Sequence, residues 1–544
     1  MADTSPPQYK ANLVGKGTSQ TVCTALVANY QINSIQILTP VTKGGGSPIE
    51  EGWGNCKEYH NMMTKRRFAA LLSLPLLGTT VSAATITVDL DGDGDYLNIQ
   101  SAIWAASDGD TVQIMPGIYT STGNTVVWIP DMNITIEGVG DAASIVIDGE
   151  NARWGLQVDT SDATGTVIRN LTVTRGLDVG IRAYNSKPRI ESCILTECNG
   201  AALVAVGDAA VAMLDCEVSY NVSDQGPAVW NPGATVTANN CEFHHNEATE
   251  GSPLASSVGG SSMTLTDCEV HHNTGDTGGV YSAYSTLIVT DCELHHNHGA
   301  YGGAAIYASG TGLVQVTGCD VSWNTSAMDG GAVAVTSGAA LEMTSSTIHG
   351  NEGRGVMVAF GSDSNIDQCT LTANSANEDL LSWGGAIWLN GGSHTITNST
   401  IAGNTALNGS GIGTNWSTSV SLVGCTIANN TSSVSYGGAL FGSYSDGDGR
   451  SISNTDFCGN LPYHMDDDFA AGDLGTNTIG GSCVWCSADV DGSLTTGLSD
   501  IYWLIENWGP CEFCKGDFNE DSSIGVADLL YVLQEWGCTM TDPV

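Results

Sequence analysis

The sequence predicts an all-β solenoid built from short parallel strands, and two observations carry this prediction. A block of the form Cys/Ser-x-apolar-x-x-Asn recurs every 23–30 residues between Cys193 and Asn460. A second element, Gly-Gly followed by small or apolar residues, falls between several of these blocks. Sequence repeats of roughly 20–50 residues are typical of solenoids. Neither a leucine-rich pattern nor a helical periodicity accompanies the repeat, which leaves strands as its unit.

Each block is expected to form one strand and the turn that follows it. Because side chains alternate along a strand, the Cys or Ser and the apolar residue two positions later share the inner face. Coils stacked roughly 4.8 Å apart then place like residues in columns. Stacked Asn amides can hydrogen-bond to one another and to the turn, and Asn tolerates left-handed backbone. This Asn column comprises Asn221, Asn246, Asn273, Asn297, Asn324, Asn351, Asn374, Asn404, Asn430 and Asn460. We therefore expect a right-handed parallel β-helix over residues 84–482, with its column cysteines as buried thiols.

The charge of the chain excludes one large class of partners. It has 58 acidic and 16 basic residues, a formal net charge of −42. Nucleic-acid binding through phosphate contacts needs Lys and Arg to release counterions, so no nucleic-acid partner is expected. The same imbalance argues against docking on anionic membranes and favours the attraction of cations.

The start of the chain has the layout of a secretory signal. A basic run, Lys65-Arg66-Arg67, is followed by an apolar stretch and by small residues up to Ala83. We interpret residues 62–83 as a signal peptide and residues 1–61 as a disordered upstream extension. A signal anchor is the alternative, although the apolar stretch is short for a membrane span. The mature chain is therefore expected to be secreted or at the cell surface, monomeric and without a membrane span.

The repeat also resembles known families. Gly-Gly-Ala-Ile/Val paired with Phe/Val/Ile-x-x-Asn resembles the repeat of polymorphic outer-membrane proteins and related right-handed β-helix proteins. The opening segment between Asp89 and Thr120 is similar to that of pectin-lyase-like folds. This resemblance implies that IQSAIWAAS is a short helix capping the open end of the solenoid and that GDTVQIMPG contains a first strand.

A different pattern occupies residues 483–544. Two segments repeat at an offset of 28 residues, and each has oxygen-bearing side chains at calcium-loop spacing followed by an apolar helix. The second loop offers Asp517, Asn519, Asp521, the carbonyl of Ser523 and Asp528; the first, poorer loop offers Asp489, Asp491, Ser493 and Asp500. Ca²⁺ is therefore the expected cofactor. Two solvated acidic loops without metal are the alternative.

These duplicated loop-and-helix units resemble a type I dockerin, which implies docking to a cohesin-like receptor. The partner-contacting pairs would be Leu498-Ser499 and Val526-Ala527, which differ from the Ser-Thr pair familiar in that family. In an oxidising compartment we expect disulfides Cys486–Cys511 and Cys514–Cys538 rather than a zinc site.

A stripe of His and Glu is the most distinctive feature of the predicted surface. Glu residues follow three column cysteines and His residues lie two positions further on, so stacked copies would bring them within reach of a transition metal such as Zn²⁺ or Cu²⁺. They are Glu242, Glu269, Glu293, His244, His271 and His295. Repeat duplication without a selected role is the alternative. Four aromatic residues near the Gly-Gly elements could line a sugar-binding face or pack against a neighbouring coil: Tyr281, Tyr307, Trp388 and Phe441.

Catalytic residues remain unknown from the sequence. Pectate-lyase-like chemistry needs a basic residue, and Arg354 is the only Lys or Arg between residues 190 and 449. The signatures of pectin methylesterases and polygalacturonases are also missing, whereas the many carboxylates leave an inverting glycosidase open. The interpretation is a non-enzymatic protein that binds or organises extracellular polysaccharide and attaches to a partner through a calcium-dependent module. A polysaccharide-degrading enzyme and a structural adhesin are the alternatives.

Overall fold

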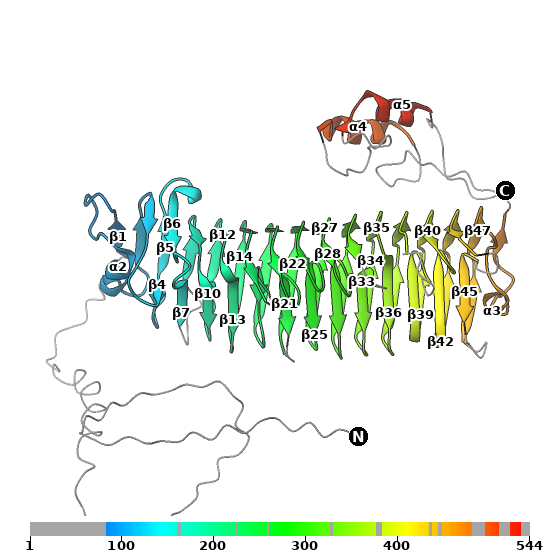
Figure 1. The fold of residues 1–544 in the computed structure, drawn as a ribbon, viewed down its shortest axis with the longest axis horizontal. Coiled ribbons are helices and arrows are strands. Elements are labelled where there is room, and N and C mark those ends of the chain that lie inside the picture. The colour runs from blue at the N-terminus through cyan, green and yellow to red at the C-terminus, as the bar shows by residue number, and fades with distance from the viewer. Residues whose placement is uncertain are drawn as a thin grey trace, which may run out of the picture. The chain divides into compact units, whose positions relative to one another are not determined.

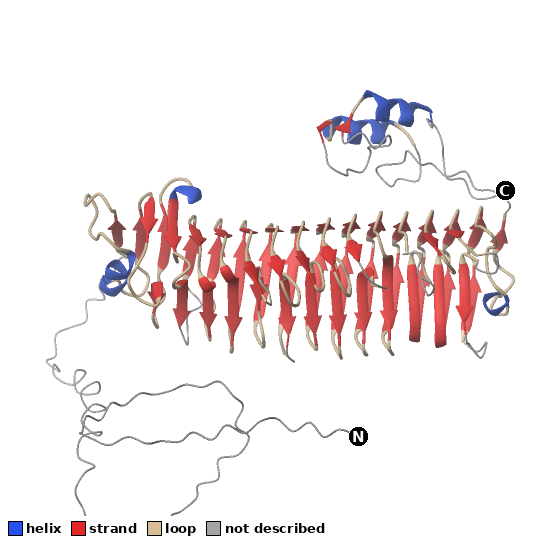
Figure 2. Cartoon of the chain, viewed as in Figure 1, coloured by secondary structure: helices blue, strands red, loops and turns tan. Residues whose placement is uncertain are grey.

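The computed structural model describes residues 83–159, 165–224, 226–257, 260–326, 330–376, 383–434, 438–443, 449–480, 496–510 and 523–534. Residues 83–480 form a parallel β-solenoid whose coils follow one another along a single axis (Figure 1). Strands make up nearly all of its regular structure (Figure 2). The predicted all-β solenoid is confirmed, and each coil contributes strands to up to three faces.

The first face carries the longer strands that precede each Cys/Ser block. Its strands are β1 (Thr85–Val88), β2 (Thr111–Ile114), β5 (Thr135–Gly138), β8 (Val167–Arg169), β11 (Arg189–Glu191), β14 (Ala210–Leu214), β18 (Thr235–Asn239), β22 (Ser262–Thr266), β26 (Thr286–Thr290), β30 (Leu313–Thr317), β34 (Ala340–Thr344), β37 (Asp363–Asp367), β46 (Arg450–Ser453) and the C-terminal halves of β39 (Ile387–Thr397) and β42 (Ile412–Val423).

The second face is the sheet of 15 short strands that contains the blocks themselves. Its strands are β3 (Gly117–Tyr119), β6 (Ile145–Asp148), β9 (Thr172–Thr174), β12 (Ile194–Thr196), β15 (Glu217–Ser219), β19 (Glu242–His244), β23 (Glu269–His271), β27 (Glu293–His295), β31 (Asp320–Ser322), β35 (Thr347–His349), β38 (Thr370–Thr372), β40 (Thr400–Ala402), β43 (Thr426–Ala428), β47 (Asp456–Cys458) and β48 (Thr478–Ile479).

The third face follows each Asn turn and a loop of variable length. Its strands are β4 (Thr125–Ile129), β7 (Trp154–Asp159), β10 (Leu177–Tyr184), β13 (Asn199–Val206), β17 (Val229–Trp230), β21 (Leu254–Ser257), β25 (Val280–Ala283), β29 (Ile306–Ser309), β33 (Gly331–Thr336), β36 (Arg354–Ala359), β45 (Leu440–Ser443) and the N-terminal halves of β39 and β42. Two-residue strands line the turn between the second and third faces: β16 (Val222–Ser223), β20 (Glu247–Ala248), β24 (Thr274–Gly275), β28 (His298–Gly299), β32 (Thr325–Ser326), β41 (Thr405–Ala406) and β44 (Thr431–Ser432).

The column cysteines lie inside the solenoid as free, buried thiols, as predicted; they are Cys193, Cys216, Cys241, Cys268, Cys292, Cys319, Cys369 and Cys425. Their sulfur atoms can accept hydrogen bonds from the preceding coil: the Cys268 N–H donates to Cys292 Sγ at 3.3 Å. The Cys319 N–H donates in the same way to Ser346 Oγ at 3.2 Å. Cys and Ser therefore alternate in this column because both are small and both accept from one backbone N–H. Burial raises the pKa of the Cys369 thiol to about 11.

The Asn column forms a continuous amide ladder, which confirms the predicted stacking. Each Nδ2 donates to the Oδ1 of the next Asn at 2.9–3.1 Å, from Asn221 to Asn460. Each Oδ1 also accepts from the backbone N–H of the Asn one coil earlier, as Asn324 does from Asn297 at 3.0 Å. The ladder thus satisfies buried polar groups at a turn where the sheet cannot.

The left-handed backbone at this turn does not fall on the ladder Asn. It falls on the residue before it, which has φ of 53° at His245, 53° at His272 and 54° at His296. The Asn side chain is buried and committed to the ladder, so the preceding, outward-facing residue takes the tight conformation. A second left-handed residue precedes the Cys column, for example Asp267 at φ 50° and Asp291 at φ 51°.

A few helices complete the described chain. Helix α2 (Ile99–Ala105) buries Ile99, Ala102 and Ile103 in the main core, and its N-terminal Ser101 N–H is capped by the Asn98 side chain at 2.8 Å. The 3₁₀ turn η2 (Ala142–Ser144) and helix α3 (Asp467–Ala470) are short. No helix among the described residues is long and apolar enough to cross a membrane.

The C-terminal segment contributes two helices of equal length, α4 (Leu498–Glu506) and α5 (Val526–Gln534). They share a small core of Leu504, Ile524 and Val532, and β49 (Gly509–Pro510) pairs antiparallel with β50 (Ser523–Ile524). Several predictions lie outside the described residues: the extension 1–61, the signal peptide up to residue 82, and the four cysteines of the two predicted C-terminal disulfides.

Candidate functional site

One register position on the third face carries an unusual number of aromatic side chains. Pairing from strand to strand joins Trp128, Gln157, Arg182, Val204, Trp230, Ala255, Tyr281, Tyr307, Ala334, Met357, Trp388, Gly413 and Phe441 into one column. We call this the aromatic column. It contains all four aromatic residues that the sequence singled out, and it adds Trp128 and Trp230.

The two tyrosines in the middle of the column are stacked on each other. The ring centroids of Tyr281 and Tyr307 lie 5.8 Å apart with an interplanar angle of 13°. Each hydroxyl reaches a hydroxyl one coil further on, Tyr281 to Ser309 Oγ at 3.4 Å and Tyr307 to Thr336 Oγ1 at 3.4 Å. Both side chains are half-buried, so one face of the pair packs on the solenoid while part of it remains open to solvent.

Two clefts matter for the site. The larger, of about 510 Å³, lies between the first and second faces, and the smaller, of about 480 Å³, lies directly beside the aromatic column. Trp230, Ala255 and Tyr281 all line the smaller cleft, which we call the third-face cleft, and the small Ala255 lies between the two aromatic residues in the column. Two carboxylates, Glu250 and Asp276, also line it. The hydroxyl of Thr277 is buried there and has no hydrogen-bond partner among the described residues. Aromatic walls with a few polar groups are typical of ligand sites.

Among the described residues, no basic side chain lines the third-face cleft: Arg182 lies in the column two strands before Trp230, and the two arginines on the C-terminal side of the cleft are buried. Arg354 is 2 % exposed, its Nε donates to the Trp383 carbonyl at 2.6 Å, and its guanidinium lies 4.8 Å from the ring centre of Trp388. Arg450 is also buried and donates to Thr414 Oγ1 at 2.8 Å. Both guanidinium groups are therefore held inside the protein, where they cannot clamp a uronate.

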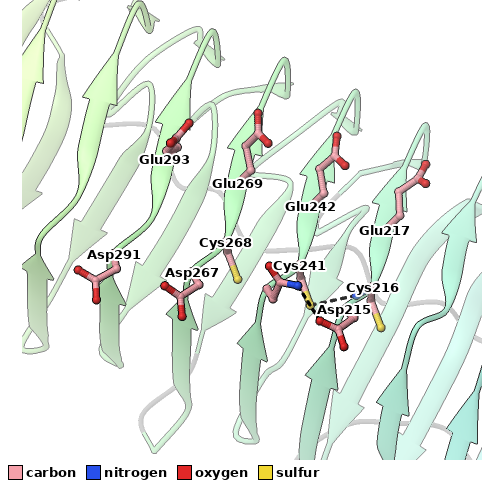
Figure 3. Close-up of a pocket in the computed structure, with 11 residues that line it drawn as sticks. Asp215, Cys216, Glu217, Cys241, Glu242, Asp267, Cys268, Glu269, Asp291 and Glu293 are labelled. Atoms are coloured by element: carbon pink, nitrogen blue, oxygen red, sulfur yellow. Dashed lines mark hydrogen bonds between the residues drawn. The ribbon is translucent and has the colours of Figure 1, made fainter. Parts of the chain in front are cut away.

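The larger cleft is an acidic groove between the first and second faces. Figure 3 shows two rows of carboxylates crossing successive coils, with column cysteines between the two rows. One row is Asp215, Asp267 and Asp291, at the left-handed turn; the other is Glu217, Glu242, Glu269 and Glu293, at the start of the second-face strands. The sequence between residues 190 and 353 contains no Lys or Arg to neutralise them.

The second-face strands bring the predicted His and Glu residues together on the neighbouring surface. The rings of His244, His271 and His295 stack at 5.1 and 5.0 Å, because their strands pair in register. Each Nε2 faces carboxylates: His271 Nε2 lies 3.1 Å from Glu242 Oε1, and His295 Nε2 lies 2.9 Å from Glu269 Oε1. A second row, His245, His272 and His296, stacks beside the first at 5.1 and 5.0 Å.

The electrostatics of this cluster keep part of it neutral. Burial, with the neighbouring imidazoles, lowers the pKa of His272 and of His296 to about 4. Burial also lowers the pKa of His271, whereas the hydrogen bond from His295 lowers the pKa of Glu269. Burial and the charge of Glu269 raise the pKa of Glu293. Neutral imidazole is the form that binds metal ions.

The predicted calcium and partner residues are described only in part. Asp500 and Asp528 occupy equivalent places in α4 and α5, are fully buried, and accept from the N–H groups of Gly497 at 2.6 Å and Gly525 at 2.8 Å. Ser523 lies in β50. Asp489, Asp491, Ser493, Asp517, Asn519 and Asp521 lie outside the described residues. The pairs Leu498-Ser499 and Val526-Ala527, which are predicted to contact a partner, are the first two residues of α4 and α5, and Leu498 and Val526 are exposed.

Sequence reasoning missed the third-face cleft and its residues Trp230, Glu250 and Asp276. The third-face strands lack the Cys/Ser-x-apolar pattern, and loops of variable length separate them from it, so the repeat does not show which residues pair. The one available signal was the spacing after the Gly-Gly elements, which identified Tyr281 and Tyr307 but not Trp230.

Comparison with known proteins gives a family. The model described as "Right handed beta helix region" matches residues 101–247, 154–314 and 304–455, which together cover more than half of the chain. No curated protein matches the sequence significantly. The similar solved structures include pectate lyase Pel9A, at 13 % identity and a TM-score of 0.30 over 68 % of this chain and 82 % of that one.

Two further solved structures are equally distant. The catalytic unit of a GH87 alpha-1,3-glucanase from Streptomyces thermodiastaticus is 14 % identical, with a TM-score of 0.34 over 70 % of each chain. The A-module of the mannuronan C-5 epimerase AlgE6 from Azotobacter vinelandii is 16 % identical, with a TM-score of 0.29 over 66 % of this chain and 94 % of that one. The repeat, the three-faced parallel solenoid and the family match agree: this chain belongs to the right-handed beta-helix family.

Proposed function

We propose that the solenoid binds a neutral extracellular polysaccharide along the aromatic column, with the third-face cleft as the main subsite. The observation that carries this proposal is the register that aligns Trp230, Tyr281 and Tyr307 on one face. Aromatic rings offer flat apolar surface to a ligand, and the carboxylates and hydroxyl of the cleft offer hydrogen bonds.

The charge of the cleft selects the class of glycan. Glu250 and Asp276 would repel a uronate, and the two arginines nearest in sequence on the C-terminal side are buried. At the cleft, an anionic chain would therefore meet like charge, because none of the described lining residues is basic. A neutral chain incurs no such cost, and its hydroxyl groups can donate to both carboxylates.

Hydrolysis of the bound glycan is the second candidate, because Glu250 and Asp276 line one cleft. Inverting glycosidases use two carboxylates on opposite sides of the scissile bond. Glu250→Gln and Asp276→Asn would each abolish the release of reducing ends if this pair is catalytic, while retention on the glycan would remain.

We also propose that the C-terminal segment is a calcium-dependent attachment module of a secreted protein. The equivalent places of Asp500 and Asp528 in the first turns of α4 and α5 support this, because these two carboxylates occupy the last position of the two predicted calcium loops. The disulfide at Cys458 supports an oxidising compartment. In a calcium titration of the full chain, Asp517→Ala should lower the calcium affinity more than Asp489→Ala does. Equal effects would contradict the ranking of the two loops, and no calcium binding would contradict the module.

Helix α2 is proposed to protect the N-terminal end of the solenoid. It contacts β1, β2 and β4 and buries Ile103 completely. An uncovered first coil would expose strand edges and apolar core to water and to other chains. Ile103→Asp should therefore promote self-association, measured by light scattering, more than the exposed change Trp104→Asp.

The glycan proposal is tested with the full chain on a panel of insoluble neutral and acidic polysaccharides. We expect retention on a neutral glycan, and a loss of affinity of about tenfold or more for Tyr281→Ala, which corresponds to about 1.4 kcal/mol. Tyr284→Ala is the matched control, because Tyr284 is 60 % exposed at the turn after β25 and lies outside the column.

Two results would overturn the proposal. Equal retention of the Tyr281→Ala and Tyr284→Ala variants would remove the column from the binding site. Retention on acidic glycans alone would contradict the charge argument.

A further inference from the structure

The second face carries a metal-binding geometry that the glycan proposal does not use. The residues that form it are the stacked His and Glu side chains described above, which we call the His–Glu stripe: Glu242, Glu269, Glu293, His244, His245, His271, His272, His295 and His296. The stripe contains three groups of three residues, and within each group the three ligand atoms lie within 4.8 Å of one another. The stripe spans three consecutive coils, so the geometry repeats.

The first group has the spacing of a tetrahedral zinc site. Glu242 Oε1 lies 3.6 Å from His244 Nε2 and 3.1 Å from His271 Nε2. With metal–ligand distances near 2.1 Å, two ligands of a tetrahedral Zn²⁺ are about 3.4 Å apart. The two distances bracket this value, so small rotations of the side chains would complete the site.

The second group follows one coil further on. Glu269, Glu293 and His295 bring two carboxylates and one imidazole together, with His295 Nε2 at 2.9 Å from Glu269 Oε1. The third group, His271, His272 and His295, shares His271 with the first group and His295 with the second. The first two groups can therefore be filled together, whereas the third competes with both.

The second row of imidazoles holds the first row in the orientation that a metal requires. Nδ1 of His244, His271 and His295 lies 2.8, 2.7 and 2.8 Å from Nδ1 of His245, His272 and His296, respectively. A metal bound at Nε2 would replace the proton that faces the carboxylate, and the first-row Nδ1 would then carry the remaining proton and donate it to the second row. Metal-binding histidines are commonly oriented by such a hydrogen bond on the other ring nitrogen. Repeat duplication without a selected role does not require this contact between the two rows of imidazoles.

The charge of the surroundings also favours a cation. Glu217, Glu242, Glu269 and Glu293 follow one another along the stripe, and no Lys or Arg occurs between residues 190 and 353. Stacked carboxylates repel one another, and a bound divalent ion relieves that repulsion. Imidazole with carboxylate is a ligand set suited to zinc among the divalent metals.

We propose that the His–Glu stripe binds two Zn²⁺ ions, one at Glu242, His244 and His271 and one at Glu269, Glu293 and His295. The remaining coordination positions face solvent and are available to water or to an oxygen-bearing ligand. The site lies on the second face, so it is independent of the aromatic column on the third.

The test is a competition titration of the full chain with Zn²⁺ against a chromophoric chelator. The loss of a residue that only orients a ligand lowers metal affinity by about 10–100-fold, so the loss of a ligand should cost at least as much. His271→Gln is therefore expected to remove one high-affinity equivalent and His295→Gln the other. Any zinc bound elsewhere on the chain is common to all variants and cancels in the comparison.

Two controls separate binding from folding. His298→Gln changes an exposed histidine outside all three groups and should bind as many ions as the unchanged chain. Glu242→Gln keeps the shape of an exposed side chain and should weaken the first site without altering the circular dichroism spectrum. Unchanged stoichiometry and affinity in His271→Gln and Glu242→Gln would overturn the proposal, as would equal losses in His298→Gln.

Discussion

The Asn ladder makes a sharp prediction about what holds the coils together. Asn324 is fully buried, donates to the Leu294 carbonyl at 2.8 Å and accepts from the Asn297 N–H at 3.0 Å. Asn324→Ala removes these two bonds, together with the side-chain bonds to Asn297 Nδ2, Ser322 and Asn351, and it leaves the Leu294 carbonyl and the Asn297 N–H without these partners in a place that water does not reach. Each buried group left without its partner costs about 1–3 kcal/mol, so the variant should lose about 2–6 kcal/mol of unfolding free energy.

The neighbouring Asn residues of the ladder keep other hydrogen bonds, which limits the loss of unfolding free energy to this range. Asn297 Nδ2 keeps its bond to the Val270 carbonyl at 2.8 Å, and Asn351 Oδ1 keeps the Asn324 N–H at 2.9 Å. The loss should therefore come from two groups and not from the collapse of the whole ladder.

Urea denaturation of the full chain, followed by far-ultraviolet circular dichroism, measures this loss. Asn239→Ala is the matched control, because Asn239 is exposed on β18 and surface changes usually stay within about 0.5 kcal/mol. Hydrogen exchange should show the loss concentrated in the coils beside residue 324, since each coil contacts only its neighbours. An Asn324→Ala midpoint equal to that of Asn239→Ala would refute the role of the ladder.

Three further outcomes are expected, each measured by denaturation. Cys292→Ser should cost less than about 1.5 kcal/mol because Ser346 already fills an equivalent place, whereas Cys292→Leu should cost about 1–3 kcal/mol by overpacking; the reverse order would contradict the column. Burial lowers the pKa of His394 below 6.5, so its contribution to stability is complete above pH 6.5 and is lost as the pH falls through the lowered value. His394→Gln should therefore flatten the decline in stability below pH 6.5, and an unchanged slope would contradict this. Arg354→Lys should lose about 1–3 kcal/mol because an ammonium cannot keep both the Trp383 bond and the planar stacking on Trp388, and a neutral result would contradict it.

Much of the fold could be predicted because the second face is nearly identical from coil to coil. The Cys and Asn columns have one conformation each, so their spacing alone indicates inward cysteines and a ladder of amides. The His and Glu positions followed from the same strands, which is why Glu242 and His271 lie together as expected.

The third face could not be derived in the same way. Its strands follow loops whose lengths differ, so Trp230 and Tyr281 occupy one column although their local sequences differ. The position of the left-handed residue was also hidden, because the outward residues that adopt it include His245, Trp323 and Ala373 and share no side-chain chemistry. Their common property is their place before a buried Asn.

The variable loops have a consequence for how such a chain can change. Block spacing ranges from 23 to 30 residues, yet second-face strands stay paired without a register shift. Differences in length are therefore absorbed outside the ladders, and a coil behaves as an interchangeable unit. Copying one of the three coils that carry paired histidines in frame would lengthen the solenoid by one coil and add one more pair of imidazoles beside the existing ones. The number of ligand positions on this surface can thus grow or shrink by whole coils, without any new fold having to be found.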